Sequence, residues 1–149
     1  MENDARRIAA SHDGAAGATV ELWHASLERF GAGQLNDRFR ARFRKPMDSA
    51  AWAGWFAVKV VWEASQRARV VAGDAIASFL ERDTTAFDGH KGVPLSFRRW
   101  DHQLRQPLYV VDSPASRTAV VTTVPTDPAP LRASLDALGT TAETTSCQW

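Results

Sequence analysis

The segment that most limits the fold is AAWAGWFAVKVVWEASQRA, residues 50–68, which is apolar on nearly every face when it is wound as a helix. Lys59 and Glu63 stand four residues apart and can pair on the polar face that remains. The aromatic residues at helical spacing are typical of a core rather than of a ligand site; they are Trp52, Trp55, Phe56 and Trp62. A helix of this composition must be covered on several sides by other elements.

Apolar spacing predicts further helices on both sides of this segment. The pattern from Val20 to Phe30 predicts a helix, with a strand entering that helix as the open alternative. A second helix is predicted over residues 35–45, where phenylalanines recur every four residues. Asp48 or Ser49 is expected to cap the long apolar helix, and Asp74 a shorter helix after it. The first half of the chain is therefore predicted to be helical.

The period of the apolar pattern changes from about 3.6 to 2 after residue 92. Residues 93–97 alternate between apolar and other side chains, and Leu108–Val111 and Ala119–Val124 are predicted as two further strands. Leu131–Leu138 is predicted as a final short helix. The fold class is therefore α/β, with helices followed by about three strands. These are too few strands for a complete open sheet beneath the long helix.

Charge and cysteine content exclude several classes of partner and site. The formal net charge is +1, so no global field draws the chain to nucleic acid or to an anionic membrane, and any basic function must be local. The segment RFRARFRK, residues 38–45, is expected to be a solvated amphipathic face, and no nucleic-acid partner is predicted. The single cysteine, Cys147, excludes an internal disulfide and a multi-cysteine metal site.

The segment FDGHKGVPLSFRRWDHQLRQPLYVV, residues 87–111, carries most of the residues that could do chemistry. Its GHKG turn lacks the spacing of a phosphate loop and leads into a strand rather than a helix. Its turn residues also lack metal-ligand spacing and are expected to mark exposed bends; they are Asp88, His90, Asp101 and His102. The chain also lacks a GxSxG nucleophile motif and a paired acid and base. We therefore predict no enzyme activity, no metal and no cofactor.

Three parts of the chain are predicted from composition. Residues 1–17 mix small and charged residues and are expected to be a flexible tail, residues 18–125 to be the folded domain, and residues 126–149 to be an extension with a short helix and a frayed end. The N-terminus carries no apolar run of signal-peptide length, so the chain as written is expected to stay in the cytoplasm.

Two long segments together resemble a known family: LNDRFRARFRKPMDSAAWAGWFAVKVVWEA, and GDAIASFLERDTTAFDGHKGVPLSFRRWDHQLRQPLYVV after it. They are similar to the C-terminal part of a type I periplasmic binding protein of the branched-chain amino acid (leucine-binding) class. More narrowly, they resemble the ABC-transporter substrate-binding proteins associated with pyrroloquinoline quinone (PQQ)-dependent alcohol dehydrogenase systems. The turn at Phe87, Gly89 and Gly92 carries the match best, and the similarity covers residues 20–112.

The resemblance implies a partial two-lobed fold in which the present chain supplies only the C-terminal portion. It implies a small-molecule solute and a membrane permease as partners, and a periplasmic location. Trp23 and His24 fall near the end of a strand that would face the cleft between lobes, so they are the expected ligand contacts. The alternative is a stand-alone α/β interaction domain that associates with itself or with another protein through the apolar helix and binds no solute.

Overall fold

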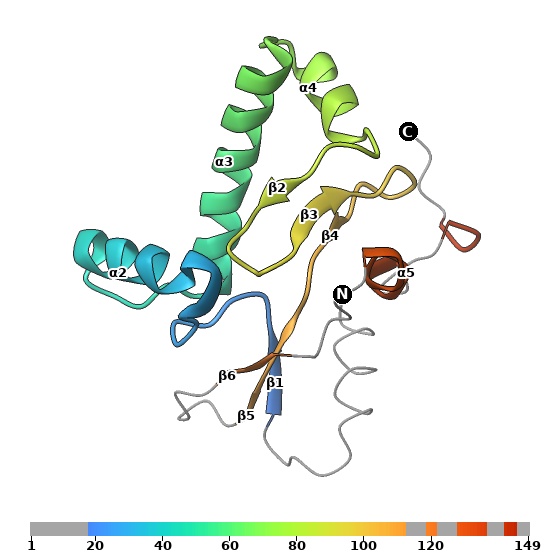
Figure 1. The fold of residues 1–149 in the computed structure, drawn as a ribbon. Coiled ribbons are helices and arrows are strands. Elements are labelled where there is room, and N and C mark those ends of the chain that lie inside the picture. The colour runs from blue at the N-terminus through green and yellow to red at the C-terminus, as the bar shows by residue number, and fades with distance from the viewer. Residues whose placement is uncertain (1–17, 113–118, 122–127, 137–141, 146–149) are drawn as a thin grey trace.

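The computed structural model describes residues 18–112, 119–121, 128–136 and 142–145 (Figure 1). The helices are the 3₁₀ turn η1 (Arg29–Gly31), α2 (Ala32–Phe43), α3 (Ser49–Ala68), α4 (Gly73–Leu80) and α5 (Pro128–Asp136). The strands are β1 (Ala18–Glu21), β2 (Phe87–Asp88), β3 (Pro94–Phe97), β4 (Leu104–Arg105), β5 (Tyr109–Asp112) and β6 (Ala119–Val121). The α/β class is confirmed, although the described strands are short and β1 precedes the helices.

The strands form two separate antiparallel sheets, which Figure 1 shows at different places along the molecule. One sheet has the order β1-β5-β6, and Val20 pairs with Val110 across its first two strands. The other has the order β2-β3-β4 and lies beside α3. Among the described residues, the segments 22–28 and 106–108 lead from the β1-β5-β6 sheet to the rest of the fold, and β6 is joined to α5 through residues 122–127, which lie outside the described residues.

The core lies between α3 and the β2-β3-β4 sheet. One face of α3 is buried through Trp52, Phe56, Val60 and Ala64, and it packs on buried residues of the sheet that include Phe87 and Leu95. The rings of Trp52 and Phe56 stack with their centroids 5.1 Å apart. The side chain of Asp48 accepts a hydrogen bond from the Ala51 amide, so the predicted N-cap of the long helix is confirmed.

The predicted helix from Val20 to Phe30 is wrong, and the strand that was kept as its alternative is correct. Residues 18–21 pair with β5, which lies far away in the sequence, and this long-range pairing overrides the local helical spacing. Beyond β1 the chain is held by a side chain rather than by helix hydrogen bonds, because Ser49 Oγ accepts from the amides of Leu22 and Trp23. Tertiary contacts thus decide the conformation of this segment.

Smaller differences concern element ends. The N-cap of α4 is Ala72, and Asp74 lies in the first turn of the helix instead of capping it. The last helix begins at Pro128, earlier than predicted, because proline fits the first turn of a helix. Sequence periodicity did not predict β2 and β4, which have two residues each. The predicted tail, residues 1–17, lies outside the described residues.

One face of the long helix is left uncovered by the described residues. Val58, Val61 and Trp62 of α3 are exposed, and Trp62 retains 64% of its accessible surface. Within the described residues, no helix is long and apolar enough to cross a membrane. The expectation that several sides of this helix are covered is therefore met by the sheet and by α4, whereas no described residue covers the face with Val58, Val61 and Trp62.

Two glycines test the packing of this core. A Cβ at the buried Gly89 would lie 2.4 Å from Leu95 Cδ1 and 3.1 Å from the Trp52 ring, so Gly89→Ala should lower the free energy of unfolding by about 1–3 kcal/mol. A Cβ at Gly54 in α3 would meet nothing within 4 Å, so Gly54→Ala should raise the free energy of unfolding by about 0.5–1 kcal/mol. Urea unfolding measures both, and equal effects from the two variants would contradict the packing described.

Candidate functional site

Lys91 is buried at the junction between the two sheets. Its side chain comes from the turn between β2 and β3, and the residue is only 4% exposed. The ammonium donates hydrogen bonds to the carbonyl oxygens of Leu22 (2.7 Å) and Pro107 (3.0 Å) and to Gln106 Oε1 (2.8 Å). One side chain thus holds the segment after β1 and the segment before β5.

Two aromatic rings complete the surroundings of this ammonium. Lys91 Nζ lies 4.1 Å from the centroid of Trp52 and 5.2 Å from that of Tyr109. Among the described residues, no carboxylate contacts it, so burial dominates and lowers the pKa of Lys91 to about 7. Burial also raises the pKa of the Tyr109 hydroxyl to about 12.

Trp23, the first predicted ligand contact, is linked to the Lys91 site through Trp52, which both residues contact. Its indole is completely buried and stacks on Trp52, with the ring centroids 5.8 Å apart. The indole N–H donates to Asn36 Oδ1 at 2.8 Å, and the Asn36 amide donates to the carbonyl oxygens of Ala25 and Leu27. All these polar groups are satisfied inside the protein, so Trp23 positions the loop after β1.

The second predicted contact, His24, lies in that loop and is half-buried. Its Nδ1 atom lies 2.8 Å from Ser26 Oγ and also accepts from the Ser26 amide at 3.2 Å. Within the described part of the chain, no hydrogen bond to the other ring nitrogen is found. The structure therefore separates the two predicted residues, placing Trp23 in the core and His24 near the surface.

Of the turn residues that were considered as metal ligands, Asp88 and His90 contact each other, with His90 Nδ1 3.7 Å from Asp88 Oδ2, whereas Asp101 and His102 have other partners. His90 Nδ1 lies 3.0 Å from the Phe30 carbonyl oxygen, and its ring stacks on Trp55. His102 Nε2 lies 3.0 Å from Glu81 Oε1 instead. Across residues 18–112 and the shorter described stretches, no group of three histidine, cysteine or acidic side chains could hold a metal ion.

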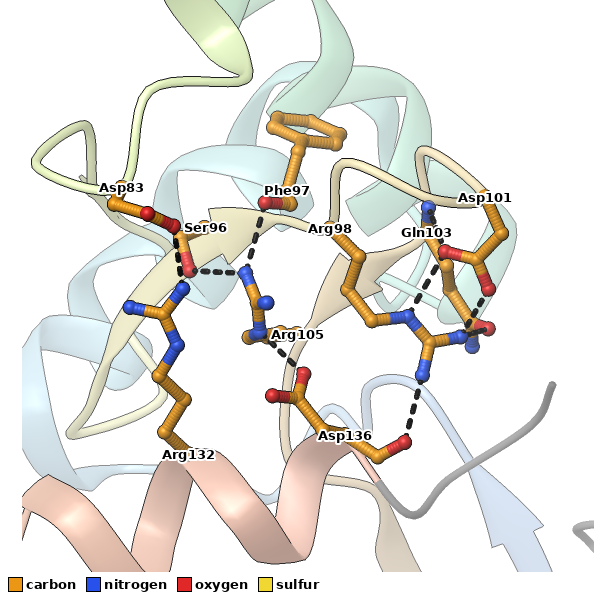
Figure 2. Close-up of polar contacts among 9 residues, drawn as sticks. All are labelled: Asp83, Ser96, Phe97, Arg98, Asp101, Gln103, Arg105, Arg132 and Asp136. Carbon is orange, nitrogen blue, oxygen red and sulfur yellow. Dashed lines mark hydrogen bonds and ion pairs between the residues drawn. The ribbon is translucent and has the colours of Figure 1, made fainter. Parts of the chain in front are cut away.

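Two arginines of the β3-β4 hairpin are buried against α5 (Figure 2). Arg98 is 1% exposed; it donates to the Asp101 carboxylate, to Gln103 and, at 3.1 Å, to the carbonyl oxygen of Asp136. Arg105 is 5% exposed and donates to Asp136 Oδ1 at 2.5 Å and to the Phe97 carbonyl oxygen at 2.8 Å. Asp136, at the C-terminal end of α5, thus contacts both guanidinium groups.

An open apolar groove runs between α2 and α3 and has a volume of about 650 Å³. We call it the α2–α3 groove; its main apolar and aromatic lining residues are Phe39, Phe43, Gly54, Trp55, Val58 and Trp62. Lys59 also lines it, and its ammonium pairs with Glu63 at 2.6 Å. The exposed face of α3 forms one side of this groove.

Sequence patterns did not predict that the side chains of Lys91, Arg98 and Arg105 are buried and hold other segments in place. Each lies in a stretch rich in turn residues and charges, where a basic side chain is usually solvated. The flanking glycines of Lys91 permit a tight turn but do not show which way the side chain points. For Arg98 and Arg105, the partner Asp136 is supplied by a helix much later in the chain, and local spacing does not reveal it.

The Lys91 site predicts a pH dependence of stability. The pKa is about 7 in the folded protein and 10.5 ordinarily, so the unfolded chain binds more protons between these values. Stability should therefore rise with pH from about 7 to about 10, by at most about 1.4 kcal/mol per pH unit. Above about pH 10 the raised pKa of Tyr109 opposes the rise, because unfolding then releases a phenolic proton.

Lys91→Met is the matched variant, since it keeps the length of the side chain and removes the charge. Its free energy of unfolding should be nearly independent of pH across the same window. Urea titrations at several pH values between about 7 and 10 measure the difference between the two proteins. Parallel pH profiles would show that Lys91 does not carry the effect.

The buried arginines predict a large cost for removing their shared partner. Asp136→Ala leaves Arg105 without its carboxylate in a buried place and should lower the free energy of unfolding by about 3 kcal/mol. Asp83→Ala is the control, because it removes an exposed ion pair with Arg132 and should change stability little. Thermal unfolding compares the two variants, and an equal loss in both would argue against a structural role for the buried pair.

None of the curated proteins compared with the chain matches it. The structure is similar to the crystal structure of an ABC-type branched-chain amino acid transporter from Rhodopseudomonas palustris CGA009, with 25% identity and a TM-score of 0.55. That match covers 72% of this chain and 29% of the other, so the chain spans less than a third of the solved protein's length. Residues 1–118 match the sequence pattern of the periplasmic binding proteins, and the chain belongs to this family.

Proposed function

We propose that the chain is part of the solute-binding component of an ABC transporter. The family match over residues 1–118 is the observation that carries this proposal. The similar structure is named as a branched-chain amino acid transporter, so branched-chain amino acids are the first solutes to test. A solute linked to PQQ-dependent alcohol oxidation is the finer form of the same proposal. The partners would be that solute and a membrane permease, and the location would be the periplasm.

The geometry of the junction supports a conformational role. The segment after β1 and the segment before β5 are both bonded to Lys91, so a rotation of the β1-β5-β6 sheet against α3 would pivot near this ammonium. Binding proteins capture a solute by closing two bodies around it, and such closure requires a few residues that bend while the bodies stay rigid. Asn36 and Ser49 fix Trp23 in the segment after β1, so in this proposal Lys91 marks the pivot and not a segment that bends freely.

Trp23 and His24 retain different roles in this proposal. His24 would touch the solute, because it is half-buried and one ring nitrogen has no hydrogen bond within the described residues. Trp23 would act indirectly. Its indole bonds to Asn36, and Asn36 bonds to the loop that carries His24. The direct contribution to solute affinity is therefore assigned to His24.

A second candidate function is that of an interaction domain that associates through α3 and binds no solute. The exposed apolar residues Val58, Val61 and Trp62 favour it, because exposed apolar surface that is contiguous usually marks a contact with another molecule. A second copy of the chain is one occupant of that face. The two functions are distinguished by whether a small solute binds.

Thermal unfolding with added solute tests the main proposal. Leucine, isoleucine, valine and short alcohols with their aldehydes and acids would be titrated, and a bound solute should raise stability by about 2.7 kcal/mol at a hundred times its dissociation constant. His24→Ala should weaken that effect, whereas Gln66→Ala, on an exposed turn of α3, should not. Absence of any saturable effect, both here and in a longer polypeptide that supplies the rest of the fold, would overturn the proposal.

A further inference from the structure

The α2–α3 groove combines an apolar floor with a basic border. Five exposed basic residues follow one another on α2 and just beyond it: Arg38, Arg40, Arg42, Arg44 and Lys45. Arg38 donates to Gln34 Oε1 at 3.3 Å, and none of the five forms an ion pair with a carboxylate of the described chain. These positive charges outnumber the single acidic residue of α2, Asp37, and no described carboxylate is paired with them.

Helix geometry places this charge beside the groove. Phe39 and Phe43 lie one turn apart on α2 and line the groove, and Arg38 and Arg42 precede each of them by one residue. Arg40 lies on the other flank of the same phenylalanine row. The single cation that lines the groove, Lys59, is already paired with Glu63, so the free charge belongs to α2.

We propose that the α2–α3 groove binds an amphipathic helix with an acidic polar face, supplied by another protein. The apolar face of such a helix would lie on Val58 and Trp62, and its carboxylates would pair with the arginines of α2. The volume of about 650 Å³ accommodates several bulky side chains. Gly54 leaves open space, because a Cβ there would meet nothing within 4 Å, and a large apolar anchor of the partner can enter at this point.

Charge decides between this occupant and a second copy of the chain. A symmetric dimer through α3 would bring two α2 helices to the same interface, each with an uncompensated row of arginines, and like charges oppose such contacts. Shape decides against a membrane surface, because a flat bilayer reaches exposed Trp62 and Val58 but not the floor between the helices. This inference does not depend on solute capture, since neither His24 nor Lys91 lines the groove.

The test uses a designed helical peptide of about 18 residues, long enough to form a helix on binding, with leucine and tryptophan on one face and glutamate on the other. Fluorescence anisotropy of the labelled peptide measures its affinity for the full chain. Trp62→Ala should raise the dissociation constant about tenfold or more, because aromatic side chains at a groove carry much of the binding energy. Val71→Ala, 92% exposed and outside the groove, should leave it unchanged.

Charge is tested separately. The double variant Arg38→Glu with Arg42→Glu should also weaken the acidic peptide about tenfold, whereas Arg99→Glu, exposed on the β3-β4 hairpin, should not. A peptide with lysine in place of every glutamate should bind the double variant better than the unchanged chain. Equal binding of the acidic and basic peptides to the unchanged chain would overturn the proposal.

The other occupants are outcomes of the same experiment. Anionic phospholipid vesicles and a single-stranded DNA oligonucleotide are titrated beside the peptides, and sedimentation measures the oligomeric state of the free chain. Binding of vesicles or oligonucleotide that Trp62→Ala abolishes, with no binding of the acidic peptide, would assign the groove to that ligand instead. A dimer that Trp62→Ala dissociates would assign it to a second copy.

Discussion

The buried ammonium of Lys91 is the contact on which the arrangement of the fold depends. It holds Leu22, Gln106 and Pro107 together beneath Trp52, and thereby fixes where the β1-β5-β6 sheet meets the rest of the chain. A charge in such a place is costly, and three oxygen acceptors and an aromatic face replace only part of the water it lost, so the pKa of Lys91 falls to about 7. An apolar side chain would fill this space without joining the two segments.

Sequence periodicity predicted most of the helices and the strands β3, β5 and β6, and it failed where long-range contacts decide the conformation. The periodicity of α2 and α3, and the Asp48 cap, depend on neighbours within a few residues, and those predictions were confirmed. The helix predicted from Val20 was wrong because Val20 pairs with Val110, a contact that spacing within the segment does not contain. Local patterns therefore describe the helical half well, whereas the connections between the sheets depend on long-range contacts.

The candidate site was predictable only in part for a related reason. Trp23 and His24 were chosen because they lie where an element meets a loop, and the structure places that loop next to the junction. What the sequence did not contain was the direction of each side chain: Trp23 points into the core and Lys91 points inward from a glycine-flanked turn. Direction follows from how the loop after β1 and the β2-β3-β4 sheet pack on α3, so it becomes visible only when the elements are assembled.

The chain separates its positive charges into two kinds, and this separation explains how a protein of net charge +1 can carry a basic surface. Arg98 and Arg105 are buried and have carboxylate partners, so their charge is cancelled within the fold. The arginines of α2 are exposed and have no such partners among the described residues, while much of the compensating acid lies elsewhere on the molecule. Net charge therefore describes the long-range field, whereas the short-range field at the α2–α3 groove depends on which charges folding has already paired.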